Sequence, residues 1–113
     1  MIPRKEIIHQ ELNLLDYNIG KCINYFLDTL NFSGATVYKD APWFSVGEHY
    51  HRVDDYIYIL DGELHLEQEE KVNIYKKGDF LIVPKETLHS VKPWNWSKYI
   101  VANQDGDFDT YFR

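Results

Sequence analysis

Histidines and an aspartate are the residues of this chain whose types and spacing could do chemistry. His49 and His51 are separated by a single residue, and Asp55 follows shortly after them. Because side chains alternate faces along a strand, both imidazoles point to one side, and an extended chain brings Asp55 to that side as well. Imidazole nitrogens and carboxylate oxygens together bind divalent transition metals. The stretch therefore indicates a metal site, and the alternative is a pair of histidines exposed on a surface strand.

His89 offers a third imidazole. It follows the turn-like segment at residues 84–88 and begins another short strand-like stretch. Three protein ligands hold a metal such as zinc and leave a position open for water or substrate. Apolar side chains near these ligands would form the walls of a substrate pocket. The residues that we expect there are Ile57, Ile59, Val91 and Trp94.

The composition excludes several classes of protein. The 113 residues carry a formal net charge of -6, and the scattered positive residues argue against binding to nucleic acid or to an anionic membrane. An apolar fraction of 44% is enough for a hydrophobic core. Cys22 is the single cysteine, so we expect neither a disulfide framework nor a thiolate zinc site, but a small buried apolar residue. With no signal-peptide pattern and no membrane-spanning run, we expect a cytoplasmic protein.

Most of the chain has the pattern of short strands separated by turns. Asp61 and Gly62 form a turn signal between two of these strands. Strands at this spacing predict an all-β barrel or sandwich. Tyr56 and Tyr58 alternate away from the ligand side, so we expect them on an outer surface or in a dimer contact. The predicted strands are residues 35–39, 49–51, 56–60, 63–67, 72–75, 80–83, 89–91 and 99–102.

The N-terminal part has a different, mixed pattern. Ile23, Phe26 and Leu30 fit one face of a helix, although an edge strand over residues 4–30 is the alternative. The sequence at residues 31–34 then reads as a break. We therefore predict an N-terminal extension at residues 1–34, packed on the barrel or on a partner subunit, and a barrel at residues 35–113.

The spacing of the candidate ligands resembles the two sequence motifs of the cupin superfamily. Asp55 stands where the family usually has a glutamate, which is one methylene longer, while Trp43, Glu86 and Pro93 replace two glycines and an asparagine of the motifs. The resemblance covers residues 47–93, the central part of the chain. The matching residues are His49, His51, Asp55 and Gly62 in the first motif and Gly78, Pro84 and His89 in the second.

The resemblance implies a jelly-roll β-barrel that holds a divalent transition metal (Fe, Zn, Mn or Ni) through the three histidines and Asp55. Asp55 would be the fourth ligand, or would instead hydrogen-bond a ligand histidine or a metal-bound water. Cupins include dioxygenases, isomerases and lyases as well as non-enzymatic binding or sensor modules, and both kinds stay open, as does a barrel that has lost its activity. No cation in the matched strands clearly points inward, which favours a small-molecule substrate without phosphate. A homodimer is expected because cupins are commonly dimers.

Overall fold

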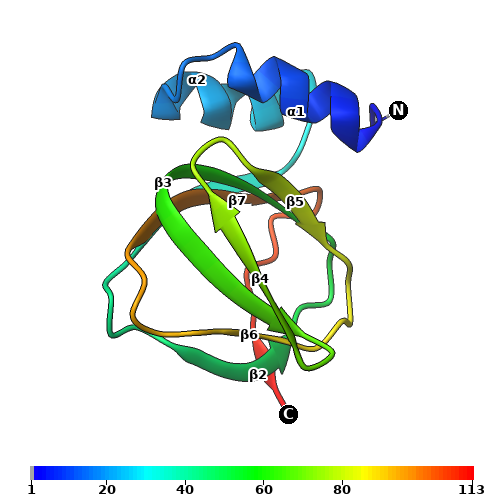
Figure 1. The fold of residues 1–113 in the computed structure, drawn as a ribbon. Coiled ribbons are helices and arrows are strands. Elements are labelled where there is room, and N and C mark those ends of the chain that lie inside the picture. The colour runs from blue at the N-terminus through cyan, green and yellow to red at the C-terminus, as the bar shows by residue number, and fades with distance from the viewer. Residues whose placement is uncertain (1) are drawn as a thin grey trace.

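A curled antiparallel sheet with helices over one face makes up the fold in the computed structural model, which describes residues 2–113 (Figure 1). This confirms the all-β jelly-roll prediction. The sequence predicts every strand in this part of the chain except β8 near the C-terminus. The strands are β1 Gly34–Asp40, β2 Val46–Tyr50, β3 Asp55–Gln68, β4 Lys71–Lys76, β5 Phe80–Val83, β6 His89–Val91, β7 Ser97–Asn103 and β8 Tyr111–Phe112.

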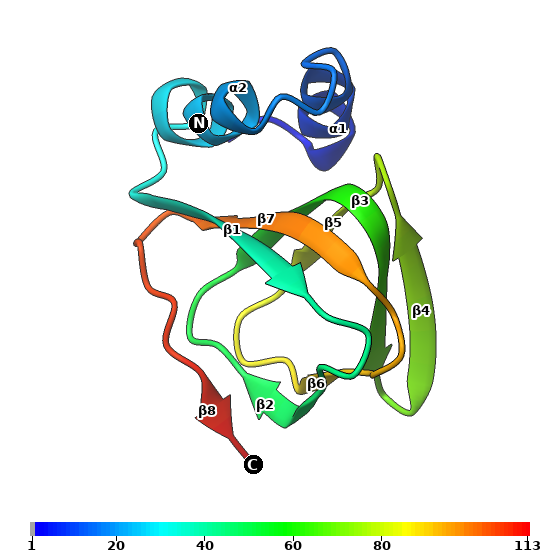
Figure 2. The ribbon, with the colours of Figure 1, turned by 90° about the vertical axis from the view of Figure 1, so that its left-hand side faces the viewer.

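The long strand β3 joins the two halves of the curled sheet. Its first part pairs with β5 and β7, and β7 pairs in turn with β1. Its second part pairs with β4 and β6, and β6 continues through β2 to β8. Figure 2 shows the resulting arrangement, with β1 and β7 on the side of the helices and β2 and β8 on the opposite side. The barrel interior lies between these two halves.

Gly62 bends β3 where the sequence predicts a turn. The turn prediction at Asp61 and Gly62 is wrong, because the strand continues through both residues and its register with β7 shifts at a bulge there. Gly62 has a φ of 71°, and a Cβ at this position would collide with the backbone carbonyl of Trp96. Glycine therefore lets one strand serve both halves of the barrel.

The N-terminal part is helical, which decides between the two alternatives that the sequence leaves open for residues 4–30. The second helix begins where the side chain of Asn18 accepts a hydrogen bond from the backbone nitrogen of Lys21 (2.9 Å). This bond satisfies one of the amide groups left free at a helix start. Within residues 2–113 the helical elements are α1 Lys5–Asn13, α2 Ile19–Asn24 and the π-helical turn η1 Tyr25–Thr29.

These helices pack on the outer face of β1, β7, β3 and β5 (Figure 2). Phe26, Cys22 and the outward side chains of β3, Tyr56 and Tyr58, are buried together in this layer. The prediction that the tyrosines lie on an outer surface or in a dimer contact is therefore wrong, because the helices of the same chain cover them. The predicted division of the chain into an N-terminal extension and a barrel at residue 34 stays a prediction, because the helices share a hydrophobic core with the sheet.

Three further observations concern the N-terminal helices. The side chain of His9 donates a hydrogen bond to the backbone carbonyl of Gly78 (2.6 Å), which ties α1 to the turn between β4 and β5. Cys22 is fully buried, as the sequence predicts, and burial raises the pKa of its thiol to about 11. Among residues 2–113, none of the helices combines the length and apolar character needed to span a bilayer.

Candidate metal centre

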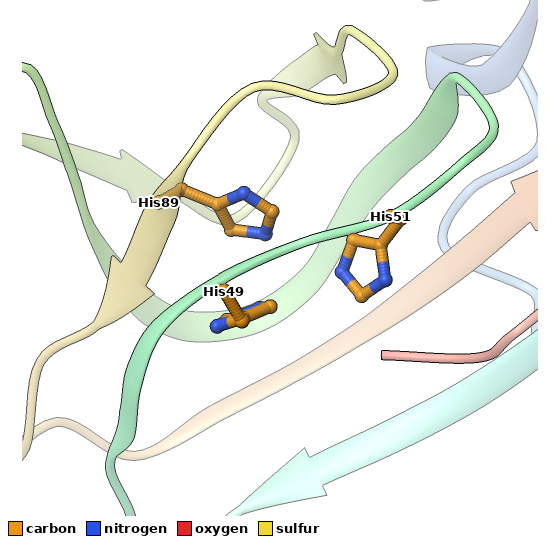
Figure 3. Close-up of side chains that lie close together, drawn as sticks. All are labelled: His49, His51 and His89. Carbon is orange, nitrogen blue, oxygen red and sulfur yellow. The ribbon is translucent and has the colours of Figure 1, made fainter. Parts of the chain in front are cut away.

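Two neighbouring strands bring three histidines together inside the barrel. His49 on β2 lies directly opposite His89 on β6 in the antiparallel pair, and His51 directly follows β2. One ring nitrogen from each of the three residues lies within 4.8 Å of the others, and Figure 3 shows the imidazoles gathered at one place. Strand pairing therefore unites a pair that is local in sequence with a residue far along the chain.

Hydrogen bonds fix the tautomer of each imidazole. The Nδ1 atoms of His49 and His89 donate to the backbone carbonyls of Gly47 (2.6 Å) and Thr87 (2.9 Å). The Nδ1 atom of His51 donates to the carbonyl of Asp109 (2.9 Å). A carbonyl oxygen can only accept, so a neutral ring with Nδ1 protonated keeps its lone pair on Nε2. Such bonds from the other nitrogen are characteristic of histidines that ligate metals.

Burial keeps two of these rings neutral at physiological pH. The exposed fractions of His49 and His89 are 4% and 5%. Desolvation lowers the pKa of His49, and it lowers the pKa of His89 to about 4, because the charged imidazolium loses its hydration inside the barrel. Metal ligation needs neutral imidazole. Tautomer and protonation state thus both fit a divalent transition metal.

Asp55 lies beside the histidines but outside the group of close donor atoms. The chain leaves the strand between His51 and Asp55 instead of continuing extended, yet this bend still brings Oδ2 of Asp55 to 3.7 Å from Nε2 of His51. Burial raises the pKa of the Asp55 carboxyl, and nearby His51 and a hydrogen bond from Asn103 act in the opposite direction. The role of Asp55 as fourth ligand stays a prediction.

Asn103 holds the surroundings of the centre together, and the sequence analysis missed it. Its side-chain Nδ2 donates to Oδ1 of Asp55 (3.1 Å) and to the backbone carbonyl of Asp107 (2.8 Å), and its Oδ1 accepts from the Asp107 amide (3.0 Å). The backbone that Asn103 holds at Asp107 continues to Asp109, whose carbonyl accepts a hydrogen bond from Nδ1 of His51. Alternation along β7 was the available signal, because it places Asn103 on the inner face with Val101.

A cavity of about 220 Å³ opens beside the histidines, and Asp55 also lines it. Two of the predicted pocket residues, Ile57 and Val91, form part of its wall. Ile59 and Trp94 do not, which corrects the prediction. Ile59 is wholly buried in the apolar cluster that also contains Ile57. Trp94 is 77% exposed, because its backbone nitrogen bonds to the carbonyl of Pro42 and holds the loop between β6 and β7 outside the barrel.

The cavity also contains a second polar group that sequence reasoning missed. Asp40, the last residue of β1, is only 6% exposed, and its Oδ2 accepts a hydrogen bond from the hydroxyl of Tyr99 (2.7 Å). Both residues line the cavity. No sequence signal marked Asp40, because a charged residue just before Pro42 reads as part of a solvated turn.

Comparison with known proteins supports the fold. No protein with curated annotation matches the chain. The polyketide cyclase RemF from Streptomyces resistomycificus is 18% identical over 69% of this chain and 58% of its own, with a TM-score of 0.61. The DMSP lyase DddQ from Ruegeria pomeroyi DSS-3 is 17% identical over 69% of this chain and 41% of its own, with a TM-score of 0.59.

A salicylate 1,2-dioxygenase variant from Pseudoaminobacter salicylatoxidans, in complex with gentisate, is also similar. It is 10% identical over 62% of this chain and 19% of its own, with a TM-score of 0.56. At these identities the similarities show the fold alone. The family described as Cupin domain matches residues 37–93, just over half of the chain, and this match includes all three histidines and Asp55. The chain belongs to the cupin domain family.

Proposed function

We propose that this protein is a metal-dependent cupin enzyme that acts on a small, non-phosphorylated polar molecule. His49, His51 and His89 hold a divalent transition metal, and iron, zinc, manganese and nickel all fit these donors. When bound, the metal supplies Lewis-acid polarisation of a substrate oxygen, or redox chemistry in the case of iron. The similar structures include a cyclase, a lyase and a dioxygenase, so the fold does not select one reaction.

The convergence of three imidazoles is the observation that carries the proposal. Each Nδ1 is held by a backbone carbonyl, so the Nε2 lone pairs are available without rearrangement of the backbone. All three histidines line the cavity, so their Nε2 lone pairs can be taken up there by water or by a metal ion.

The cavity supports a small substrate without a phosphate group. Its volume of about 220 Å³ is below the ~300–1,000 Å³ that is typical of pockets for drug-sized ligands. Among residues 2–113, neither lysine nor arginine lines it. A phosphate would therefore lack the cationic partners that usually bind it. The chain's own contribution is to exclude water through the apolar walls and to orient the substrate beside the histidines.

The alternative function is a non-enzymatic small-molecule-binding or sensor module. The observation that favours it is the scarcity of groups for proton transfer. Within residues 2–113, the titratable side chains that line the cavity beyond the histidines and Asp55 are Tyr38, Asp40 and Tyr99. Two of these are already hydrogen-bonded to each other.

Metal analysis of protein purified without a chelating tag tests the proposal. We expect a single transition-metal ion per chain and its loss in His49→Ala. His65→Ala is the matched control, because His65 hydrogen-bonds Glu63 (3.0 Å) and does not line the cavity. Equal metal content in both variants would contradict the proposal. Mass spectrometry of small molecules incubated with the metal-loaded protein then separates the functions: conversion indicates an enzyme, and a compound that stays bound to the protein without conversion indicates a binding module.

A further inference from the structure

Asp40 is a buried carboxylate that the metal centre does not use. It is the last residue of β1 and pairs in register with Ser97 of β7, while its side chain lines the cavity. Desolvation raises the pKa of Asp40, and hydrogen bonds from Tyr99 and Ser97 partly offset this effect. The carboxylate is thus held in place by neutral donors in a site with little water.

No cation of the chain compensates this carboxylate. Across residues 2–113, no lysine, arginine or histidine forms an ion pair with Asp40. Burying an ionised acidic group without a cationic partner costs free energy. The cavity is open to a ligand at this position, so the missing positive charge can come from that ligand.

Aromatic side chains line the same cavity as Asp40. The rings of Tyr38 and Tyr99 lie 5.7 Å apart between centroids, and both line the cavity. Phe44 also lines it, at a tight turn directly after Asp40 in which the Phe44 amide donates to the carbonyl of Ala41 (2.9 Å). Ring faces attract ammonium groups through the cation–π interaction. A carboxylate with aromatic neighbours is a combination suited to an organic cation.

The distance to the histidines determines the length of a ligand that would reach both ends. Tyr99 and Asn103 lie on the inner face of β7, and four residues of strand span about 13 Å. Tyr99 bonds Asp40, while Asn103 bonds Asp55 beside His51. The Asp40 carboxylate and the histidine centre therefore lie at separate places in the same cavity. A short, extended molecule with a polar group at each end fits this separation.

We propose that the Asp40 end of the cavity binds the ammonium group of a small amino-carboxylate whose carboxylate faces the histidine centre. The carboxylate end rests on the proposed metal function, whereas the ammonium end rests on Asp40 and the aromatic rings alone. The substrate class is then a zwitterion with a flexible chain between its charges, and Asp40 is a specificity-determining residue.

Paired test compounds separate the ammonium group from the rest of the ligand. Calorimetry with the zinc-loaded protein compares δ-aminovalerate and ε-aminocaproate with valerate and caproate, which lack the amine. We expect one or both amino-carboxylates to bind roughly 10–100-fold more tightly than the matching alkanoate, the range of a charge-assisted hydrogen bond. Equal or weaker binding of both amino-carboxylates to the wild type overturns the inference, with no variant needed.

Variants test whether the preference for the amine depends on Asp40. Asp40→Asn keeps the shape of the side chain and removes its charge, and it should abolish the preference for the amine while leaving alkanoate binding within about twofold. Asp28→Asn is the matched control, because it makes the same charge change at an exposed residue of η1 outside the cavity. A preference that survives in Asp40→Asn, or is lost equally in Asp28→Asn, overturns the assignment.

A measurement without metal distinguishes this inference from the proposed function. If the wild type binds no zinc, the proposed function fails, and the ammonium site is tested with butylammonium against butanol on the metal-free protein. Tighter binding of butylammonium by wild type than by Asp40→Asn then supports the site by itself. The same weak binding of both compounds by both proteins overturns it.

Discussion

At the residue scale, the fixed tautomers of the three histidines make the ligand set testable atom by atom. Asp55 is the candidate ligand whose role needs a test. Its Oδ2 lies 3.7 Å from His51 Nε2, and its Oδ1 already accepts a hydrogen bond from Asn103. The carboxylate would act either as a fourth metal ligand or as a hydrogen-bond partner of a ligand histidine or of a metal-bound water. Affinity alone does not separate these roles, because partners outside the ligand set also change affinity ~10–100-fold.

Coordination spectra separate the two roles of Asp55. We predict that Asp55→Ala loaded with Co²⁺ loses one protein oxygen and takes up water or an anion in its place, and that His89→Ala loses the ordered centre altogether. Absorption spectra and oxygen/nitrogen ligand counts of both variants against wild type are the measurement. An unchanged spectrum in Asp55→Ala, beside a collapsed one in His89→Ala, would show a centre of three histidines only.

Asn103 gives a second prediction at this scale. Asn103→Ala removes the bonds that hold Asp55 and the backbone of Asp107, and so loosens the segment whose Asp109 carbonyl orients His51. We expect Co²⁺ affinity to fall roughly 10–100-fold, as for other residues that orient metal ligands. Competition titration with a chelator measures this change. The control is Asn24→Ala on the exposed surface of α2, and an equal effect in both variants would refute the orienting role.

At the element scale, the bend of β3 decides whether the two halves of the barrel meet. Gly62→Ala forces a side chain into positive φ and against the carbonyl of Trp96. We expect a loss of at least about 2 kcal/mol in the free energy of unfolding, and a melting temperature lower by roughly 10 °C. Thermal unfolding of the metal-free protein measures it. Gly47→Ala is the control, because a Cβ there meets nothing within 4 Å; a similar loss in both variants would contradict this reason.

At the scale of the whole molecule, metal binding and folding are coupled, because β2 and β6 bring the three ligands together only in the native barrel. At free metal about a hundredfold above Kd, the linkage stabilises the fold by about 2.7 kcal/mol. The expected rise in melting temperature is on the order of 10–20 °C. Thermal unfolding of metal-loaded protein with and without a chelator measures it, and identical curves would rule out the coupling.

The homodimer expected from the sequence stays a prediction, but the structure changes which residues are expected in the dimer contact. Tyr56 and Tyr58 are covered by the helices of the same chain, so they cannot form a dimer contact. The edge strand β4 instead exposes Val72 and Ile74, which together offer an apolar surface and free backbone groups. We predict that Ile74→Lys shifts a dimer toward monomer in sedimentation at micromolar concentration. Sedimentation of the wild type as a monomer under those conditions would contradict the predicted dimer.

The sequence by itself determined most of the strands, the fold family and the three histidines. Alternation along a strand is a local property, so it placed His49 and His51 on one side without knowledge of the barrel. The motif spacing added His89, because the turn before β6 has a fixed length. The same local reasoning failed at Gly62, where a turn and a bulge share one sequence signal, since both need positive φ.

The tertiary structure alone decided which groups surround these histidines. Asn103 reaches Asp55 across 48 positions of sequence, and Tyr99 reaches Asp40 across 59. Such pairs arise from the register between strands, which many sequences of similar pattern could set differently. The position of Trp94 outside the barrel has the same origin, because a bond from its backbone to the distant Pro42 carbonyl fixes its loop. Local side-chain periodicity carries no information on contacts of this kind, and long-range strand pairing supplies it.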